Sequence, residues 1–434
     1  RDLLIGSERL RVEIRDKASG IVQQVINLQP ELDYDIDYIQ GRVLLSEPLS
    51  TIANDRLLVR NDGLSGNEVW LVVQYEYTPG FNQVDTLNTG GQAHAWIGDH
   101  VRIGATANHN AQNGNDSSLY GVDAIVRKTA SSFVKVQAGR SEGLVAHPLR
   151  SDDGGFSFGD PFANAPNSEV AYGYRADASV ELADWVEGFR GQVSLYGQHL
   201  DAGYSAPGQN RLKDTNQYGG VMRIPLSSKA DVTAKADRID EKQGLTSTQA
   251  EVNTGYQLTE NWRVQAGARY DERNDQVTTF DATQQRGRRT DAVAQIQYDT
   301  RGRWKAYAFG QGTAYATRDR KDNHRGGIGG AFRVSDRIAL SGEASHGTLG
   351  PAAQVGTSWQ RTDASKLYLN YALDSERGFN GLAARRGGLT LGTRQRINDH
   401  ATVFGETQYQ HVTVQGLTRS MGVDYAPTER WTFG

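Results

Sequence analysis

One segment near the middle of the chain, Trp262-Arg263-Val264-Gln265-Ala266-Gly267-Ala268-Arg269-Tyr270-Asp271, decides the fold class. Apolar residues hold every second position, and charged, amide or glycine residues hold the others. Because a β-strand places successive side chains on opposite faces, this period of two predicts a strand with one apolar face and one polar face. The same alternation recurs in residues 230–237, 389–397 and 401–410.

Segments of this kind follow one another from about residue 91 onward, and the connections between them alternate in length. The short connections are residues 98–100, 129–131, 227–229, 259–261, 300–303, 335–337, 362–365, 398–400 and 427–430, with 183–188 as a less regular member. The longer, polar ones are 111–116, 143–167, 205–214, 240–245, 272–288, 317–323, 347–351, 375–380 and 413–416. This pattern predicts an antiparallel up-and-down meander.

The apolar face of these segments needs an apolar environment. A soluble sandwich would bury it under core-filling Leu, Ile and Phe, whereas this face is dominated by Ala, Val, Tyr, Leu and Gly. Strands of about 9–11 residues tilted near 45° span a bilayer, and only closed barrels satisfy all backbone groups of strands in lipid. We therefore expect an all-β fold, a large transmembrane up-and-down antiparallel β-barrel of the bacterial outer membrane. About twenty complete strands are visible and a further one begins at Trp431, so we expect 22 or more in the intact barrel, because single-chain bacterial barrels have even strand numbers. The alternative is that the twenty strands close alone.

Composition excludes several other classes of protein. The 434 residues contain no Cys, which removes disulfide frameworks, thiolate zinc sites and thiol catalysis. The net charge of −4 gives no footprint for nucleic-acid binding. Membrane helices need about 20 consecutive apolar residues, and the longest run here is Val69 to Val73. Mean hydropathy is −0.59 because the two faces of the strands cancel in the average.

We expect two domains. Residues 1–65 carry two short hairpins, formed by 10–15 with 21–28 and by 32–38 with 42–45, and predict a small β-domain that is periplasmic or plug-like. Residues 66–434 form the barrel, which begins with a strand at 68–78 and is entered from the end with the short turns. The chain begins at Arg1 and stops at Gly434 within a strand-like segment, so we expect it to be part of a longer polypeptide, truncated at the C-terminus of the barrel.

Several stretches resemble a known class of protein. Gly6-Ser7-Glu8-Arg9, Leu32-Asp33-Tyr34-Asp35-Ile36-Asp37-Tyr38 and Gly41-Arg42-Val43 are similar to repeats in very large bacterial multidomain envelope proteins. The segments 72–77, 139–144 and 151–155 resemble the C-terminal outer-membrane barrel of the same proteins. The resemblance implies that the last of a series of β-sandwich repeats precedes the barrel, and it implies no activity.

Tryptophans and lumen charges are the first candidate functional residues. Five of the seven tryptophans lie beside short turns: Trp96, Trp185, Trp262, Trp304 and Trp431. They predict an aromatic girdle at the membrane interface, and the alternative is that Trp simply starts strands. The polar faces carry charges of both signs, which suit a water-filled lumen and argue against a strongly ion-selective pore. The simpler interpretation is that these charges only keep the lumen hydrated. The charged residues expected to line the lumen are Asp231, Lys235, Asp237, Glu251, Arg263, Arg269, Asp271, Arg394, Arg396, Glu406 and Asp424.

Two further features have a functional and a simpler interpretation. The longest loop, 143–167, is either a constriction loop that folds into the pore or an ordinary surface loop; its candidate residues are Asp152, Asp153, Phe156 and Phe158. Asp33, Asp35 and Asp37 share one strand face and form a weak calcium candidate, but a solvated strand face beside the Gly41 turn is the simpler explanation. No other metal site and no cofactor is expected.

Three functions remain open at this point. A barrel could pass small hydrophilic solutes, or it could anchor a large multidomain envelope protein or complex without transport; a soluble all-β repeat protein is the third alternative. No catalytic constellation is present, so we expect no enzyme. Expected partners are outer-membrane lipid or lipopolysaccharide, upstream domains of the same polypeptide, or other envelope proteins, and no nucleic acid.

Overall fold

The computed structural model is almost entirely β-structure. It describes residues 3–16, 20–30, 33–37, 42–45, 49, 52–53, 57–61, 63–64, 66–76, 88–111, 116–145, 149–151, 158–160, 170–207, 209–276, 286–362, 364–377, 383–398, 400–412, 415–428 and 431–433. One short 3₁₀ helix, η1 (Leu182–Asp184), is the only helical element assigned within those ranges. Among these residues no helix is long and apolar enough to cross a bilayer.

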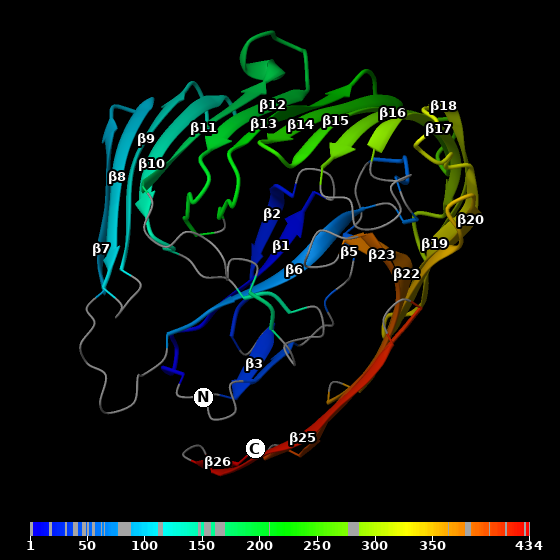
Figure 1. The fold of residues 1–434 in the computed structure, drawn as a ribbon. Coiled ribbons are helices and arrows are strands. Elements are labelled where there is room, and N and C mark those ends of the chain that lie inside the picture. Colours follow the sequence, from blue (N-terminus) through cyan, green and yellow to red (C-terminus); the bar gives the residue numbers. More distant parts are fainter. Residues whose placement is uncertain are drawn as a thin grey trace.

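Twenty strands, β7 to β26, form one antiparallel sheet in chain order, which we call the barrel sheet. Figure 1 shows this sheet curving around the N-terminal strands, from β7 on the left, over the top, to β26 at the bottom. β7 and β26 are its edges, and the described residues show no pairing between them. The strands of the first half are β7 (Asn88–Ile97), β8 (Val101–Asn110), β9 (Ser117–Arg127), β10 (Phe133–Glu142), β11 (Val170–Glu181), β12 (Gln192–Leu200), β13 (Thr215–Pro225), β14 (Ala230–Glu241), β15 (Leu245–Gln257) and β16 (Trp262–Asp275). Those of the second half are β17 (Arg286–Asp299), β18 (Trp304–Ala316), β19 (Arg325–Ser335), β20 (Ile338–Gly347), β21 (Ala352–Thr362), β22 (Ser365–Arg377), β23 (Ala383–Asn398), β24 (Ala401–Val412), β25 (Gly416–Thr428) and β26 (Trp431–Phe433).

The predicted meander is confirmed. Connections of two to five residues follow β7, β9 and every second strand after them, except that ten residues, including η1, follow β11. The connections after the strands between are mostly longer, with three-residue exceptions between β14 and β15 and between β24 and β25. One end of the barrel sheet therefore carries the mostly short connections and is called the short-turn end, and the other end carries the mostly longer ones.

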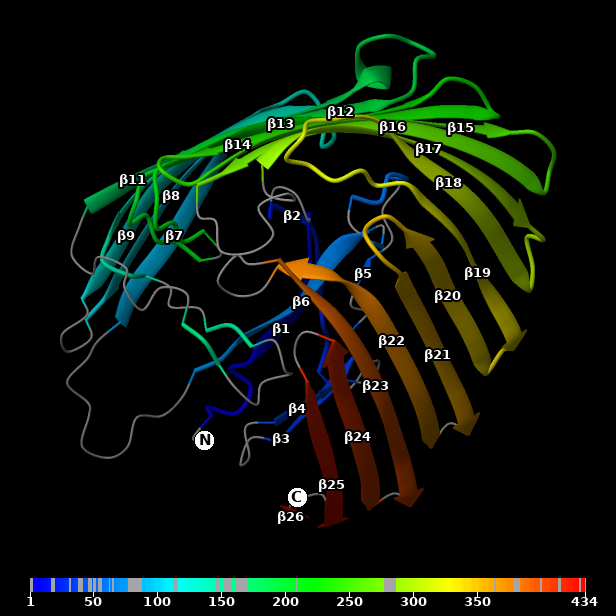
Figure 2. The ribbon, with the colours of Figure 1, turned by 45° about the vertical axis from the view of Figure 1, so that its right-hand side comes forward.

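The N-terminal strands lie inside the curve of the barrel sheet. β1 (Arg9–Arg15), β2 (Val22–Asn27), β5 (Ile52–Ala53) and β6 (Asn67–Gln74) form a four-stranded sheet in the order β2-β1-β6-β5, which we call the inner sheet. β3 (Tyr34–Asp37) and β4 (Arg42–Leu45) form a separate hairpin. Both predicted hairpins are thus present, and Figures 1 and 2 show the inner sheet enclosed by the barrel sheet from two directions.

The position of β6 differs from the sequence expectation. The strand predicted to open the barrel pairs instead with β1, from Arg9 with Gln74 to Arg15 with Glu68. The barrel sheet consequently begins at β7, and its junction with the inner sheet falls after residue 74 rather than at 65–66. β7 runs toward a short turn, so the chain joins the barrel sheet from the end with the long connections, which corrects the expected side of entry. The apolar run Val69 to Val73 explains the error, because a strand that is apolar on both faces does not show which sheet it joins.

The two faces of the barrel sheet have opposite chemistry. Most apolar residues of the strands point outward, and large ones are exposed around the sheet, for example Val136 on β10, Val252 on β15 and Ile328 on β19. The alternate residues point toward the inner sheet and include buried charges such as Glu251 and Asp291. This arrangement inverts that of a water-soluble barrel, which keeps charge outside.

A tyrosine, a glycine and a carboxylate recur in register across three adjacent strands on the inward face. Tyr307 on β18 lies over Gly329 on β19, and its hydroxyl donates a hydrogen bond of 2.6 Å to Glu343 on β20. Only glycine leaves room for a ring to cross the middle strand, because an added Cβ would overlap it. The same arrangement occurs on β12–β14 and β22–β24, with the sets Tyr196, Gly219, Asp237 and Tyr368, Gly392, Glu406.

Replacing the middle glycine should therefore destabilise the barrel sheet. In Gly392→Ala the new methyl group overlaps the Tyr368 ring, and we expect a loss of about 1–3 kcal/mol in unfolding free energy, typical of overpacking. Gly388→Ala is the matched control in the same strand, because its Cβ meets no atom within 4 Å. Guanidinium unfolding in detergent, followed by tryptophan fluorescence, measures both, and equal midpoints would contradict the packing role of Gly392.

Candidate functional site

A short segment after β5 docks onto the inward face of the barrel sheet. We call residues 57–61 the docking segment; it contains Leu57, Leu58, Val59, Arg60 and Asn61. Leu58, Val59 and Arg60 are buried although no regular secondary structure is assigned there. Its backbone groups must then find partners outside a sheet ladder, and they find them on barrel strands.

Arg60 makes the central contact. Its guanidinium donates two hydrogen bonds to the Glu343 carboxylate on β20, from Nε at 2.8 Å and from Nη2 at 2.7 Å. The two side chains are 3% and 1% exposed, so the ion pair is shielded from water. The same guanidinium stacks 3.4 Å from the ring centre of Phe309 on β18. This bidentate, stacked geometry is specific to arginine.

The backbone of the docking segment is recognised by side chains of the barrel sheet. The N–H groups of Leu58 and Val59 both donate to Glu251 Oε1 on β15, each at 3.1 Å. Arg60 exchanges two hydrogen bonds with the Gln311 amide on β18, both at 2.9 Å. Farther along, the Leu64 N–H donates to Asp374 on β22. These contacts tie residues 58–64 to strands between β15 and β22 of the barrel sheet.

Asn61 completes the docking on the side of the long connections. Arg289 on β17 donates to the Asn61 carbonyl at 2.7 Å and to its side-chain oxygen at 2.9 Å, while its Nε donates to Asp291. Asn323, in the connection after β18, donates to the carbonyls of Arg60 and Asn61 at 2.6 and 3.1 Å. A small apolar cluster of Leu58 and Val59 with Val293 and Phe309 fills the remaining space.

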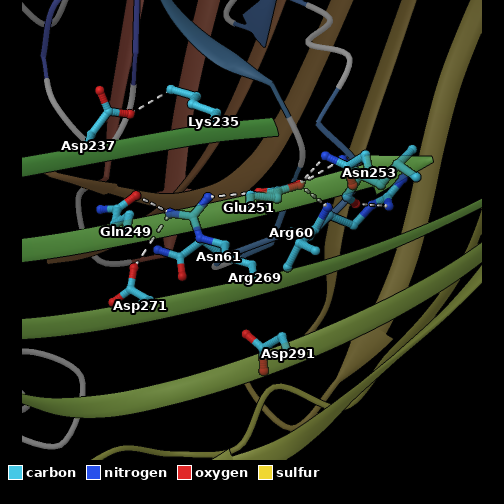
Figure 3. Close-up of polar contacts among 12 residues, drawn as sticks. Arg60, Asn61, Lys235, Asp237, Gln249, Glu251, Asn253, Arg269, Asp271 and Asp291 are labelled. Atoms are coloured by element: carbon cyan, nitrogen blue, oxygen red, sulfur yellow. Dashed lines mark hydrogen bonds and ion pairs between the residues drawn. The ribbon is translucent and has the colours of Figure 1, made fainter. Parts of the chain in front are cut away.

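Charges of the barrel sheet around the docking segment are themselves paired. Arg269 on β16 lies between Glu251 and Asp271 and also donates to Gln249, as Figure 3 shows. Arg320 forms a second ion pair with Asp271, at 2.6 Å. A buried carboxylate without such partners would cost several kcal/mol. The inward face is thus a compensated network, completed by the docking segment.

The inner sheet has ionic contacts of its own. Asp16, just after β1, pairs with Lys235 on β14, which also lies 3.4 Å from Asp237 (Figure 3). Within β1, Glu13 accepts hydrogen bonds from Arg11 and Arg15. Burial raises the pKa of Glu13, but the hydrogen bonds and charges of the two arginines outweigh it, so the pKa lies below its ordinary value of 4.5.

The residues predicted to line the lumen occupy the inward parity of their strands. Lys235, Asp237, Glu251, Arg269 and Asp271 belong to the network above. Arg263 pairs with Asp231 nearer the short-turn end, and Glu406 accepts a hydrogen bond from Tyr368. Arg394 and Arg396 lie on β23, with Arg396 exposed near its end. The side chain of Asp424 lies outside the described residues.

The five predicted girdle tryptophans are all exposed at the short-turn end. Trp262 packs against Tyr298, which packs against Trp304, with ring centres 4.8 and 5.2 Å apart. Arg127 stacks on Trp96 and Lys128 on Trp185, so cations flank the rings. Trp359, which the sequence reasoning omitted, lies near the short turn after β21 and is 44% exposed; its neighbouring turn was the available signal.

The long loop and the aspartate triplet are described in part. Asp152, Asp153 and Phe156 lie outside the described residues, while Phe158 is exposed. Beside it, Arg150 stacks 4.3 Å from the Trp70 ring of the inner sheet, so this part of the loop reaches inward. Asp33 accepts a hydrogen bond from the Gln29 N–H, and the side chains of Asp35 and Asp37 lie outside the description. Constriction and calcium binding both stay predictions.

The chemistry of this site is binding and positioning. No group of three His, Cys, Asp or Glu able to hold a metal occurs among the described residues. Sequence reasoning missed the docking segment and its partners Gln311, Asn323 and Glu343. The sequence gives only a weak signal for this site, because a Leu57–Val59 run followed by Arg60 fits many structures. The barrel residues that contact the docking segment lie about 200–280 positions away along the chain.

Comparison with known proteins gives fold-level neighbours only. No family model matches the chain, and no curated protein does. Among solved structures, a mutant of the ferric enterobactin receptor PfeA from Pseudomonas aeruginosa has 11% identity and a TM-score of 0.37, with 74% of this chain and 64% of that chain covered. The chain thus spans just under two thirds of that receptor. The copper transporter OprC has 10% identity and a TM-score of 0.42 over 79% and 74% of the two chains, and the ferric-catecholate import receptor Fiu from E. coli has 11% and 0.37 over the same shares.

Breaking the Arg60–Glu343 pair should release the docking segment. In Glu343→Gln the buried guanidinium loses its counter-charge, and removing one partner of a buried pair costs about 3–5 kcal/mol. We expect hydrogen exchange of the Leu58, Val59 and Arg60 amides to accelerate strongly. Asp123→Asn, which breaks the more exposed pair with Arg102, is the matched control and should leave these amides protected. Unchanged protection in Glu343→Gln would refute the central role of the pair.

Glu13 should make the inner sheet sensitive to acid. Because the folded pKa lies below 4.5, the stabilisation is fully present above pH 4.5 and is lost as the pH falls through the folded pKa. Hydrogen exchange of the β1 amides in the wild type should therefore rise below about pH 4.5 beyond the intrinsic pH effect. Glu13→Gln should show faster exchange at neutral pH and no such acid step. A step of equal size in both proteins would assign it to other groups.

Proposed function

We propose that this chain forms the membrane-spanning barrel of a Gram-negative outer-membrane protein. The outward face carries the proposal, because large apolar side chains are exposed on strand after strand while the charges face inward. Barrel strands of 9–16 residues from β7 to β25 match or exceed the length needed to cross a bilayer. Exposed tryptophans at the short-turn end support a membrane interface there, and in such barrels the short turns face the periplasm.

We further propose that the lumen passes small hydrophilic solutes and that the docking segment controls the passage. A sheet of twenty strands encloses a lumen wide enough for water or a plug. The inner sheet and the docking segment occupy that lumen and take the place of a plug-like domain. The docking contacts are mainly hydrogen bonds and ion pairs, which water can replace when the segment moves away.

The alternative is an anchor without transport. The burial of Arg60 with Glu343 and the number of strands that hold the docking segment favour it, because they oppose opening of the lumen. In that case the barrel holds upstream domains or partner proteins in the outer membrane, and the inner sheet is a fixed filling.

Single-channel recording of the full chain in planar bilayers distinguishes these functions. For a controlled passage we expect a small conductance in the wild type, a larger one in Glu343→Gln and wild-type behaviour in Asp123→Asn. If neither the wild type nor Glu343→Gln conducts above the bilayer leak although both insert, the passage is wrong and the anchor is supported. A chain that stays soluble without detergent and does not enter vesicles would contradict both membrane functions.

A further inference from the structure

A hollow of about 610 Å³ lies on the barrel sheet between β17 and β22, at the short-turn end. By strand register, Lys305, Arg333 and Lys366 share the inward parity with Ser341, Ser358 and Asn370. We call it the cationic pocket. Its size lies within the range of about 300–1,000 Å³ found for small-molecule sites.

The charge balance of the cationic pocket differs from that of the rest of the inward face. Its lining contains Arg301, Arg303, Lys305, Arg333 and Lys366, against the single carboxylate of Asp299. That carboxylate accepts a hydrogen bond from the Arg301 N–H at 2.7 Å within the turn. Around the docking segment, by contrast, each central arginine faces a carboxylate.

Three of these cations lack partners. Within the described part of the chain, the side chains of Arg303, Lys305 and Arg333 make no hydrogen bond or ion pair, and all three residues are exposed. Neighbouring like charges repel one another, so the cluster is disfavoured unless an anion or water compensates it. An anion in the pocket would gain charge-assisted hydrogen bonds without breaking an existing pair of these residues.

The floor of the pocket leaves room for such an anion. Small residues occupy the inward positions between the cations, including Ala331, Ala339 and Gly356. A Cβ at Gly356 would lie 3.3 Å from Asn370 Oδ1 and 3.4 Å from Ser341 Oγ, so these polar side chains converge over the glycine. Both groups carry hydrogen-bond donors that suit anionic oxygens.

We propose that the cationic pocket binds small soluble anions with two or more negative charges, of the phosphate or polycarboxylate type. Several separated cations favour a multivalent over a monovalent anion, and the amide and hydroxyl groups add directional contacts to its oxygens. The binding proposal rests on the pocket and does not require that the barrel conducts. If the proposed function also holds, the pocket lies at the periplasmic mouth of the lumen.

Isothermal titration of the detergent-solubilised full chain with inorganic pyrophosphate tests this site. We expect saturable binding at low salt that weakens as salt screens the exposed charges, and no binding of acetate. The double variant Lys305→Gln with Arg333→Gln should weaken binding by about tenfold or more. Lys229→Gln with Arg361→Gln is the matched control, because it removes the same charges from exposed positions at the short-turn end outside the pocket lining.

The outcomes separate the possible sources of the anion. Equal binding in both double variants, or no saturable binding to the wild type, would overturn the proposal. A competition with dihexanoyl phosphatidic acid tests a lipid headgroup as the ligand. Here the protein first binds radiolabelled pyrophosphate, and either the lipid or unlabelled pyrophosphate is added as competitor. If the lipid is the stronger competitor, and only on proteins that keep Lys305 and Arg333, a soluble anion is the wrong ligand. Weaker displacement by the lipid supports it.

Discussion

The structure depends on the inverted distribution of polarity in the barrel sheet. Most strands present apolar side chains to their surroundings and polar or charged ones to the enclosed space. In water such a sheet would expose an apolar surface far larger than soluble monomers tolerate. In lipid the same surface is favourable, and the ladders satisfy the backbone groups along each pair of neighbouring strands. Two small clusters are the only buried apolar cores among the described residues. Stability therefore has to come from the hydrogen bonds between strands, from an apolar environment around the outward face and from the inward polar network.

That polar network explains why the docking segment is irregular. Glu251, Gln311 and Glu343 point inward from three strands, and no single strand added to a sheet edge could satisfy all of them. A segment without ladder pairing can turn its N–H groups toward one strand and its carbonyls toward another. The buried Arg60 then supplies the charge that Glu343 needs. The segment and the inward face therefore stabilise each other, and loosening one exposes uncompensated charge on the other.

The barrel sheet could be predicted from the sequence because the features that determine it lie close together along the chain. The period of two in 262–271 and the alternating connections need only neighbouring residues, and both are found in the structure. The place of β6 and the docking segment are decided by distant partners. Val69 to Val73 is apolar at both parities, so its pairing with β1 rather than β7 is invisible in the pattern. Arg60 likewise carries no sign of Glu343, which lies 283 positions away.

The distribution of charge in the lumen is likewise not predictable from local sequence pattern, and here the difference bears on function. Counted along the sequence, charges of both signs interleave and indicate an unselective lumen. Strand register instead sorts them by height: Arg269 and Arg289 meet carboxylates near the docking segment, whereas Lys305, Arg333 and Lys366 collect at the short-turn end. A multivalent anion there would meet net positive charge before the neutral middle. Selectivity of a barrel follows the sign at each level and not the total, so a chain of net charge −4 can still present a cationic mouth.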